Sequence, residues 1–170
     1  SEAIEAVVKS QGNAKYALGS VLGHVLLHQT INGNEAILQM EQAGDYPDII
    51  VGCTGGGSNL AGLMFPFLGQ QLRGGQKIDI IGCEPLSCPS FTKGKYAYDH
   101  GDMARMTPLI KMHTLGSDFL PPANHSGGLR YHGMSYHLSH LYDLGLMRAK
   151  AYGQKECFEA GVIFGKQEGI

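Results

Sequence analysis

The stretch DIIVGCTGGGSNLAGL, residues 48–63, constrains the fold of this chain more than any other. A short apolar run leads into three consecutive glycines and then into a segment with helical spacing. A strand, a glycine-rich turn and a helix in this order form an anion-binding device, because glycine lets the backbone approach a ligand and the N–H groups at the start of the helix point toward it. We therefore predict that residues 55–59 bind a phosphate group, with a tight turn that holds no ligand as the alternative.

The elements around this turn predict the fold class. Residues 49–53 form a continuous apolar run, which is typical of a strand buried on both faces. Residues 60–72 predict a helix and residues 76–85 a second buried strand, so the three elements make a βαβ unit with parallel strands. A third strand is predicted at 148–152 and a closing helix at 154–168. We expect an α/β fold whose open, twisted, mainly parallel sheet has helices on both faces.

The other segments have weaker patterns. Residues 1–9 and 34–43 have the apolar spacing of helices. Residues 86–145 are rich in glycine, histidine, tyrosine and proline, and we expect them to be irregular. A tract of this length is too long for an ordinary loop, so it is expected to carry function or to build part of a site.

The composition excludes several classes of partner. The net charge of -2 offers no basic surface for nucleic acid. No apolar run reaches the roughly 20 residues that a membrane helix needs. The four cysteines include no C-x-x-C pair, so reduced thiols are favoured over a disulfide framework. We therefore expect a soluble cytoplasmic protein that binds neither nucleic acid nor a membrane.

Known motifs narrow the function of the glycine turn. It lacks both G-x-x-x-x-G-K-[ST] and G-x-G-x-x-G, so it is neither a P-loop nor a dinucleotide-binding fingerprint. No G-x-S-x-G motif surrounds Ser58, which argues against a nucleophilic serine. The eight histidines give only weak support for a metal site, because no H-E-x-x-H motif or paired cysteine accompanies them.

Two further residues are candidate ligands of a bound molecule. Glu84 follows the second predicted strand, at the edge of the sheet where open α/β proteins bind ligands. A capping or surface carboxylate is the alternative for this residue. Residues 124–135, NHSGGLRYHGMS, combine glycines with Arg130, and an arginine can pair with a carboxylate group. The alternative there is a structural turn with a surface arginine.

Five stretches together carry a resemblance that the glycine turn alone would not carry. They are GCTGGGSNLAGLMFPF (52–67), KYALGSVLGHVLLHQT (15–30), IIGCEP (80–85), HTLGSDFLPPANHSGGLRYHGMS (113–135) and AYGQKECFEAGVIFGKQEGI (151–170). With these stretches the chain resembles the pyridoxal phosphate (PLP) enzymes of fold type II. Within them it is most similar to the second, more divergent branch of the tryptophan synthase β chains.

The resemblance implies a PLP-dependent lyase of tryptophan biosynthesis, which joins L-serine and indole to give L-tryptophan and water. The positions that match the cradle of the PLP phosphate are Gly55, Gly56, Gly57, Ser58 and Asn59. Glu84 is a further expected cofactor residue. Arg130 replaces an aspartate of the other branch and is assigned to the substrate side. The backbone carbonyls of Tyr131 and Gly133 match a site for a monovalent cation, Na+ or K+.

The resemblance also implies that the chain is an internal fragment of a longer enzyme. In that family the lysine that forms the Schiff base with PLP lies upstream of residue 1, so the catalytic residues are unknown here and the chain alone is expected to be inactive. Residues 1–44 would be the tail of the smaller, mobile domain and residues 45–170 part of the PLP-binding domain. When residues 1–44 are separated from the rest of the enzyme, they should expose Val25, Leu26 and Leu27. The family further implies a homodimer and a weakly bound α chain.

Two other functions stay open. One is a different fold type II lyase that acts on serine or threonine, of the dehydratase or sulfhydrylase kind, although GGLRYHG and AYGQKE argue against it. The other is an isolated phosphate-binding module without enzymatic activity.

Overall fold

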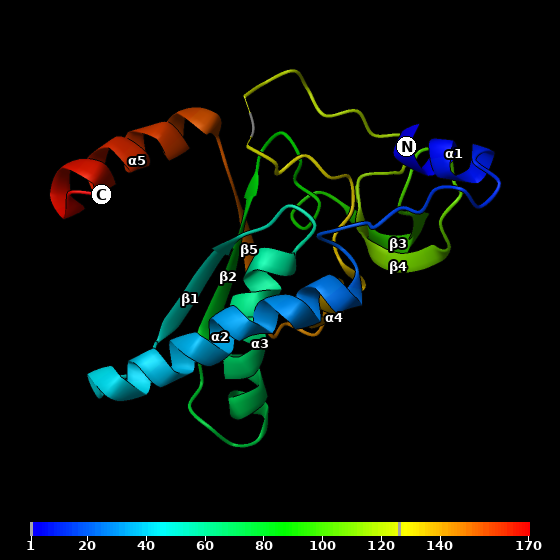
Figure 1. The fold of residues 1–170 in the computed structure, drawn as a ribbon. Coiled ribbons are helices and arrows are strands. Elements are labelled where there is room, and N and C mark those ends of the chain that lie inside the picture. Colours follow the sequence, from blue (N-terminus) through cyan, green and yellow to red (C-terminus); the bar gives the residue numbers. More distant parts are fainter. Residues whose placement is uncertain (1, 126) are drawn as a thin grey trace.

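The computed structural model describes residues 2–125 and 127–170 (Figure 1). The helices are α1 (Glu2–Lys9), α2 (Gly23–Ala43), α3 (Ser58–Leu72), α4 (Tyr136–Asp143) and α5 (Gln154–Glu168). The strands are β1 (Ile49–Cys53), β2 (Asp79–Pro85), β3 (Lys95–His100), β4 (Leu109–Thr114) and β5 (Arg148–Tyr152). β1, β5 and α5 lie at the residues that the sequence predicts. Every described helix is too short or too polar to cross a membrane.

β1, β2 and β5 form one parallel sheet, with β2 in the centre. Ile50 of β1 pairs with Ile80 of β2, and Gly82 of β2 pairs with Ala149 of β5. α3 connects β1 to β2, so these three elements make the predicted βαβ unit (Figure 1). The expected α/β fold with a parallel sheet is therefore confirmed.

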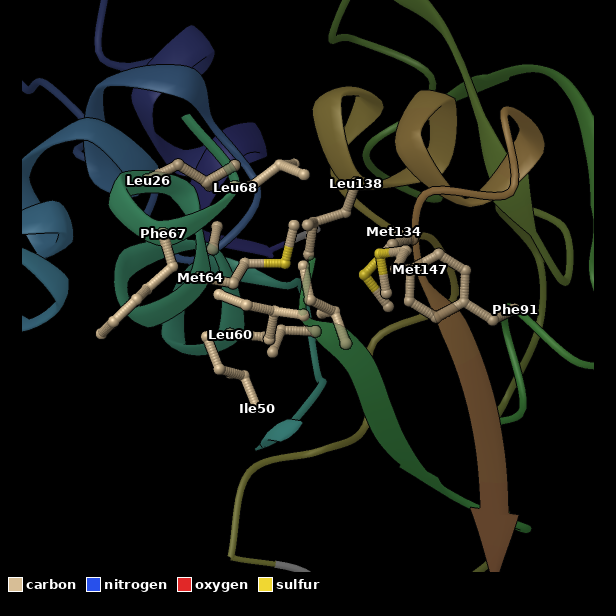
Figure 2. Packing of buried hydrophobic residues seen from close by; sticks show 13 residues of the cluster. Leu26, Ile50, Leu60, Met64, Phe67, Leu68, Phe91, Met134, Leu138 and Met147 are labelled. Atoms are coloured by element: carbon tan, nitrogen blue, oxygen red, sulfur yellow. The ribbon is translucent and has the colours of Figure 1, made fainter. Parts of the chain in front are cut away.

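α3 packs on one face of the sheet through two glycines. Gly52 and Gly82 are paired neighbours in the sheet. A β-carbon at these positions would lie 2.8 and 3.3 Å from methyl carbons of Leu60, so glycine allows the helix to approach closely. Complete burial stabilises a large apolar side chain by roughly 1.5–3 kcal/mol. Figure 2 shows the large buried side chains of α3 within this core, which are Leu60, Met64, Phe67 and Leu68.

The opposite face of the sheet is open in this chain. Ile49 and Val51 of β1 are each 55% exposed, whereas Ile50 between them is buried. The expectation that β1 is buried on both faces is therefore wrong for the described chain, because burial needs a second packed layer. α5 contributes no buried residue and extends away from the sheet in Figure 1. Close helix packing is thus found on one face.

The tract 86–145 is more regular than the sequence suggests. β3 and β4 form an antiparallel hairpin in which Tyr96 pairs with His113. α4 packs against this hairpin, and the N–H of His113 donates to Ser139 Oγ in α4 at 2.9 Å. The prediction of an irregular tract is wrong for these three elements. Their short, mixed sequences gain regular structure from each other rather than from a strong local pattern.

α2 begins at Gly23, well before the predicted start near residue 34. Its glycines explain the difference, because they serve a helix contact instead of breaking the helix. A β-carbon at Gly33 would lie 2.7 Å from the carbonyl oxygen of Gly62 in α3. Glycine at this position therefore lets the backbones of α2 and α3 approach closely, and the contact stabilises the longer helix.

The three adjacent apolar residues of α2 that were expected to be exposed differ in their burial. Leu27 is exposed, as expected, and Val25 is half-buried. Leu26 is only 1% exposed because it packs in the core between α2 and α3 (Figure 2). The expectation is therefore wrong for Leu26.

Candidate functional site

The glycine turn lies at the carboxyl end of β1 and leads directly into α3. The N–H groups of Gly55, Gly56 and Gly57 donate no hydrogen bond to another described residue. Gly57 has a φ of 109°, which lies in the left-handed region that favours glycine. Three consecutive free donors at the start of a helix suit an anion. The geometry therefore fits the phosphate group that the sequence analysis expects.

Neighbouring side chains leave no space for a β-carbon at Gly56 or Gly57. A β-carbon at Gly57 would lie 2.6 Å from Leu138 Cδ1 and 2.9 Å from Met134 Sδ. At Gly56 it would collide with the hydroxyl of Ser20. Glycine is thus required by packing as well as by backbone conformation, and a ligand at the turn meets main-chain N–H groups.

The last two residues of the expected cradle have different surroundings. Ser58 is buried, and its N–H donates to the carbonyl oxygen of Ser20 at 3.1 Å. Ser20 has a φ of 74°, a left-handed conformation that costs a non-glycine residue roughly 1–2 kcal/mol. Asn59 is exposed, so its side-chain amide is accessible to a ligand. The Ser58 amide is already used by the segment that precedes α2.

Glu84 is a buried carboxylate at the carboxyl end of β2. It accepts hydrogen bonds from the N–H of Phe91 at 2.9 Å, the N–H of Thr92 at 2.8 Å and the hydroxyl of Thr92 at 2.6 Å. Hydrogen bonds to an ionised carboxylate are stronger than those between neutral groups. Both carboxylate oxygens therefore fix the turn that follows β2. These hydrogen bonds resemble those of the capping alternative more than those of a cofactor ligand.

Arg130 is exposed and contacts its own loop. Its guanidinium donates to the carbonyl oxygen of Pro122 at 3.2 Å and that of Pro121 at 3.4 Å. These hydrogen bonds join the two sides of the loop, as the structural alternative from the sequence implies. A role on the substrate side stays a prediction.

Tyr131 and Gly133 lie on a segment that runs beside the end of β4, where Gly133 forms an isolated antiparallel bridge with Thr114. The hydroxyl of Tyr131 donates to the carbonyl oxygen of Gly101 at 2.5 Å, and burial raises the pKa of Tyr131 to about 12. The segment binds β4 through the carbonyl of His132 and the N–H of Met134. The hydrogen bonds of this bridge use the His132 carbonyl and the Met134 N–H, so the Gly133 carbonyl is not one of their acceptors. The carbonyl groups of Tyr131 and Gly133 have the oxygen chemistry that a hard cation prefers.

An apolar cavity of about 280 Å³ lies beside the glycine turn. Its walls come from α1, residues 16–22, the β3–β4 hairpin and residues 131–136. Val21 and Ser135 line the cavity and also contact the glycine turn. The N–H of Ser135 donates to the carbonyl oxygen of Gly56 at 2.9 Å, and the side chain of Val21 packs against the same glycine. The glycine turn and the cavity therefore share a wall.

The sequence analysis missed this cavity. Tyr16, Leu18 and Val21 line it, and they come from the glycine-punctuated stretch KYALGSVLG. An apolar segment that forms neither a helix nor a strand was the available signal. The packing of α1 and the hairpin around that segment is not visible in a local pattern.

The clustered histidines make structural contacts. His132 Nε2 lies 2.9 Å from the carbonyl oxygen of His100 and 3.9 Å from a carboxylate oxygen of Asp99. His24 and His28 pack edge to face, with ring centroids 6.3 Å apart. Residues 2–125 and 127–170 bring together no group of three histidine, cysteine, aspartate or glutamate side chains that could hold a metal ion.

Comparison with solved structures gives the fold. A crystal structure of a threonine deaminase from T.th. matches 85% of this chain and 45% of its own, with a TM-score of 0.60 at 16% identity. At this identity the likeness establishes the fold alone. The chain has the fold of the PLP enzymes of fold type II, with the glycine turn at the end of β1. No protein-family model matches the chain.

Comparison with curated sequences is more particular. Tryptophan synthase β chain 2 of Aeropyrum pernix is 55% identical over 170 residues, which are 100% of this chain and 38% of that relative. The proteins of the same name from Aquifex aeolicus and Thermotoga maritima are 56% and 55% identical, and the chain covers 40% of each. The resemblance to the second branch of the tryptophan synthase β chains is therefore confirmed. The chain spans about 40% of the length of the curated relatives it matches.

Proposed function

We propose that this chain is part of a PLP-dependent lyase that joins L-serine and indole to give L-tryptophan and water. The observation that carries the proposal is the wall shared by the glycine turn and the apolar cavity, formed by Val21 and Ser135. This wall would place the proposed anion-binding turn next to a space for an apolar molecule. A reaction that joins a cofactor-bound amino acid to an apolar partner needs both.

The N–H groups of Gly55, Gly56 and Gly57 would hold the phosphate group of PLP, with the exposed side chain of Asn59 beside them. When bound, PLP supplies the electron sink that removal of the serine hydroxyl requires. A hydrogen bond to a charged group contributes roughly 1.5–3 kcal/mol. Because the surrounding side chains already fix the turn, the donors need little reorganisation when an anion binds.

The apolar cavity is the proposed site for indole. Its lining is almost free of polar atoms, which suits an aromatic ring and excludes water. Exclusion of water matters because water competes with indole for the activated amino acid. A dehydratase acting on serine or threonine needs no second apolar substrate, so the cavity favours the synthase over that alternative.

The other predicted residues are proposed to act around these two places. Glu84 would position the turn after β2 through Phe91 and Thr92. A monovalent cation, Na+ or K+, would bind the carbonyl oxygens of Tyr131 and Gly133 and fix the segment that lines the cavity. We keep the substrate side as the proposed location of Arg130.

The proposed activity needs residues beyond these 170. We infer that the Schiff-base lysine lies elsewhere in the longer polypeptide, so the chain alone does not turn over substrate. We further propose that residues 1–44 are the tail of the mobile domain and that residues 45–170 are part of the PLP-binding domain. A homodimer, a weakly bound α chain and a cytoplasmic location complete the proposal, and the four free thiols support that location.

Binding at the glycine turn can be tested on the chain itself. A ¹⁵N-labelled sample is titrated separately with inorganic phosphate, PLP and pyridoxal, which lacks the phosphate group. We expect the amide resonances of Gly55, Gly56 and Gly57 to shift with phosphate and PLP and to stay fixed with pyridoxal. Gly161 of α5, which has open space around it, is the internal control. Glycine-turn resonances that ignore phosphate would contradict the proposal.

The reaction itself is tested on the longer protein that contains this chain. L-serine with indole should give L-tryptophan, measured by chromatography. Pyruvate formed from serine at the same rate with and without indole, and without tryptophan, would instead identify a dehydratase. Phosphate binding without either product would favour the isolated binding module.

A further inference from the structure

The loop of the β3–β4 hairpin, residues 101–108, forms part of the wall of the apolar cavity. Gly101 and Thr107 of this loop line the cavity, and Tyr131 lines it from the segment that runs beside β4. These residues carry two hydroxyls and the N–H and carbonyl groups of Gly101. The lining is nevertheless almost free of polar atoms. The polar groups in this part of the wall are therefore engaged with one another and not with the cavity.

Hydrogen bonds inside the loop engage its donors. The N–H of Gly101 donates to Thr107 Oγ1 at 2.8 Å, and the hydroxyl of Thr107 donates to a carboxylate oxygen of Asp102 at 2.6 Å. Asp102 is only 4% exposed, and it also accepts the N–H of Thr107 at 2.8 Å. Each of these three donors is thus bound within the loop, behind the surface that the cavity presents.

The carbonyl of Gly101 is engaged from the other side of the wall. The hydroxyl of Tyr131 donates to it at 2.5 Å. Burial raises the pKa of Tyr131 to about 12, so this hydroxyl keeps its proton at neutral pH and stays a donor. A β-carbon at Gly101 would lie 3.2 Å from the same hydroxyl, so the small size of glycine allows the close contact.

We propose that Tyr131 is a specificity-determining residue of the apolar cavity, because its hydroxyl occupies the Gly101 carbonyl and leaves the substrate no hydrogen-bond acceptor there. The inference rests on the function proposed above, in which the cavity holds indole. The N–H group of indole finds no partner in these walls, so they recognise the ring by its shape and its apolar surface. The substrate class that they accept is a flat, apolar bicyclic ring, with or without an N–H group.

The cost of removing polar groups from water sets the expected preference of these walls. A site that hydrogen-bonds a substrate group rejects an analogue without that group, whereas an apolar site does not. Indole loses the hydrogen bond that its N–H group makes with water when it enters the cavity. Benzofuran has the same ring shape with an oxygen in place of the N–H group, and it has no such donor to desolvate. We therefore expect benzofuran to bind at least as tightly as indole.

A further hydroxyl lies beside the cavity, on Ser135. Its oxygen is buried and has no hydrogen-bond partner within the part of the chain that the structure describes. This oxygen would lie 3.1 Å from a β-carbon at Gly57, so it is packed against the glycine turn. The experiment therefore includes a variant at this position, which separates the contribution of Ser135 from that of Tyr131.

The test is a binding titration of the chain labelled with ¹³C at its methionine methyl groups. Met112 and Met134 line the cavity, and Met147 in the core is the internal control. Indole and benzofuran are added separately. We expect both compounds to shift the Met112 and Met134 resonances, with benzofuran binding at least as tightly as indole.

Two results would contradict this expectation in different ways. A preference for indole of about twofold or more, the smallest effect of one hydrogen bond, would overturn the role of Tyr131 and leave the indole site standing. Met112 and Met134 resonances that ignore both compounds would overturn the proposed indole site, and this inference with it.

Matched variants assign the effect to one hydroxyl. Y131F keeps the ring and frees the Gly101 carbonyl, so the affinity for indole relative to benzofuran should rise roughly 2–10-fold, as one hydrogen bond predicts. Y98F changes an exposed tyrosine of β3 and should keep the ratio of the parent protein. An unchanged ratio in Y131F, or a preference for indole in the parent protein that S135A abolishes, would overturn the proposal. The titration of the parent protein needs no substitution, so it stays decisive if a variant folds poorly.

Discussion

α3 and α5 are helices of the same length, 15 residues each, and each follows a strand of the parallel sheet through a short turn. α3 contains seven buried residues, whereas α5 contains none. Both sequences include several large apolar side chains. Apolar content therefore makes a helix able to pack, but whether it packs depends on the surface that its neighbours offer.

Glycines on the neighbours of α3 make the difference. Gly52 and Gly82 of the sheet accept Leu60, and Gly33 of α2 accepts the backbone of α3 near Gly62. The apolar residues of α5 have no comparable surface in the described chain. More than half of the surface of each of its four largest apolar side chains is exposed, namely Phe158, Val162, Ile163 and Phe164.

The sharpest test of this comparison removes one large side chain from each helix. L60A removes a fully buried side chain and should lower the free energy of unfolding by about 2–5 kcal/mol. F158A removes a side chain that is 57% exposed and should change it by less than about 0.5 kcal/mol. Urea unfolding followed by circular dichroism measures both. Equal effects would mean that α5 is packed as tightly as α3.

A smaller effect is expected when a glycine contact is changed. G33A places a β-carbon 2.7 Å from the carbonyl oxygen of Gly62 and should destabilise the protein by about 1–3 kcal/mol. G161A is its match on α5, where a β-carbon meets no atom within 4 Å. Alanine there should stabilise the helix by about 0.5–1 kcal/mol. Thermal unfolding of both variants should thus shift the midpoint in opposite directions.

Lowering the pH should reduce the stability of β3, β4 and α4 and leave α5 unchanged. This is the smallest of the three expected effects. His113 is buried between Tyr96 of β3 and Phe91 and Tyr142, and burial lowers its pKa although Asp143 of α4 opposes this. His113 therefore binds a proton more readily in the unfolded chain than in the folded one. The stability that neutral His113 contributes is complete above about pH 6.5 and is lost as the pH falls through the lowered pKa.

Hydrogen exchange at pH values on both sides of about 6.5 can locate this loss. We expect weaker protection of β3, β4 and α4 at the lower pH and unchanged protection of α5 after correction for intrinsic exchange. H113F keeps an aromatic ring and removes the titration, so it should reduce the pH dependence. His137, whose pKa burial also lowers, is a second source of the pH dependence. Equal loss in α5 would contradict the assignment to His113.

The βαβ unit could be predicted from the sequence because its signals are local. Ile49–Cys53 is a continuous apolar run, and the three glycines follow it after Thr54. The end of α5 has a local signal too, because Gly169 adopts a left-handed conformation there. The start of α2 could not be predicted in this way. Gly33 reads as a helix breaker in isolation, and only its contact with Gly62 of α3 gives it a place inside a helix.

The candidate site likewise has one part that could be predicted from the sequence and one part that could not. The glycine turn is contiguous, so its residues and its anion chemistry are visible in sequence. The cavity is built from segments far apart in the chain, such as residues 16–22 and 131–136, which meet only in the fold. The position of Glu84 at the sheet edge was predictable, but its hydrogen bonds to Phe91 and Thr92 were not, because they depend on the path of the chain after β2.

The carbonyl of Ser20 holds the first N–H of α3, and Gly33 lies against the middle of the same helix. α2 and the segment that precedes it thus contact α3 at two separate places. The start of α3 and its middle are therefore both in contact with the chain segment that contains α2. If residues 1–44 move as the tail of a mobile domain, that movement has to break the Ser20–Ser58 hydrogen bond and the contact of Gly33 with α3.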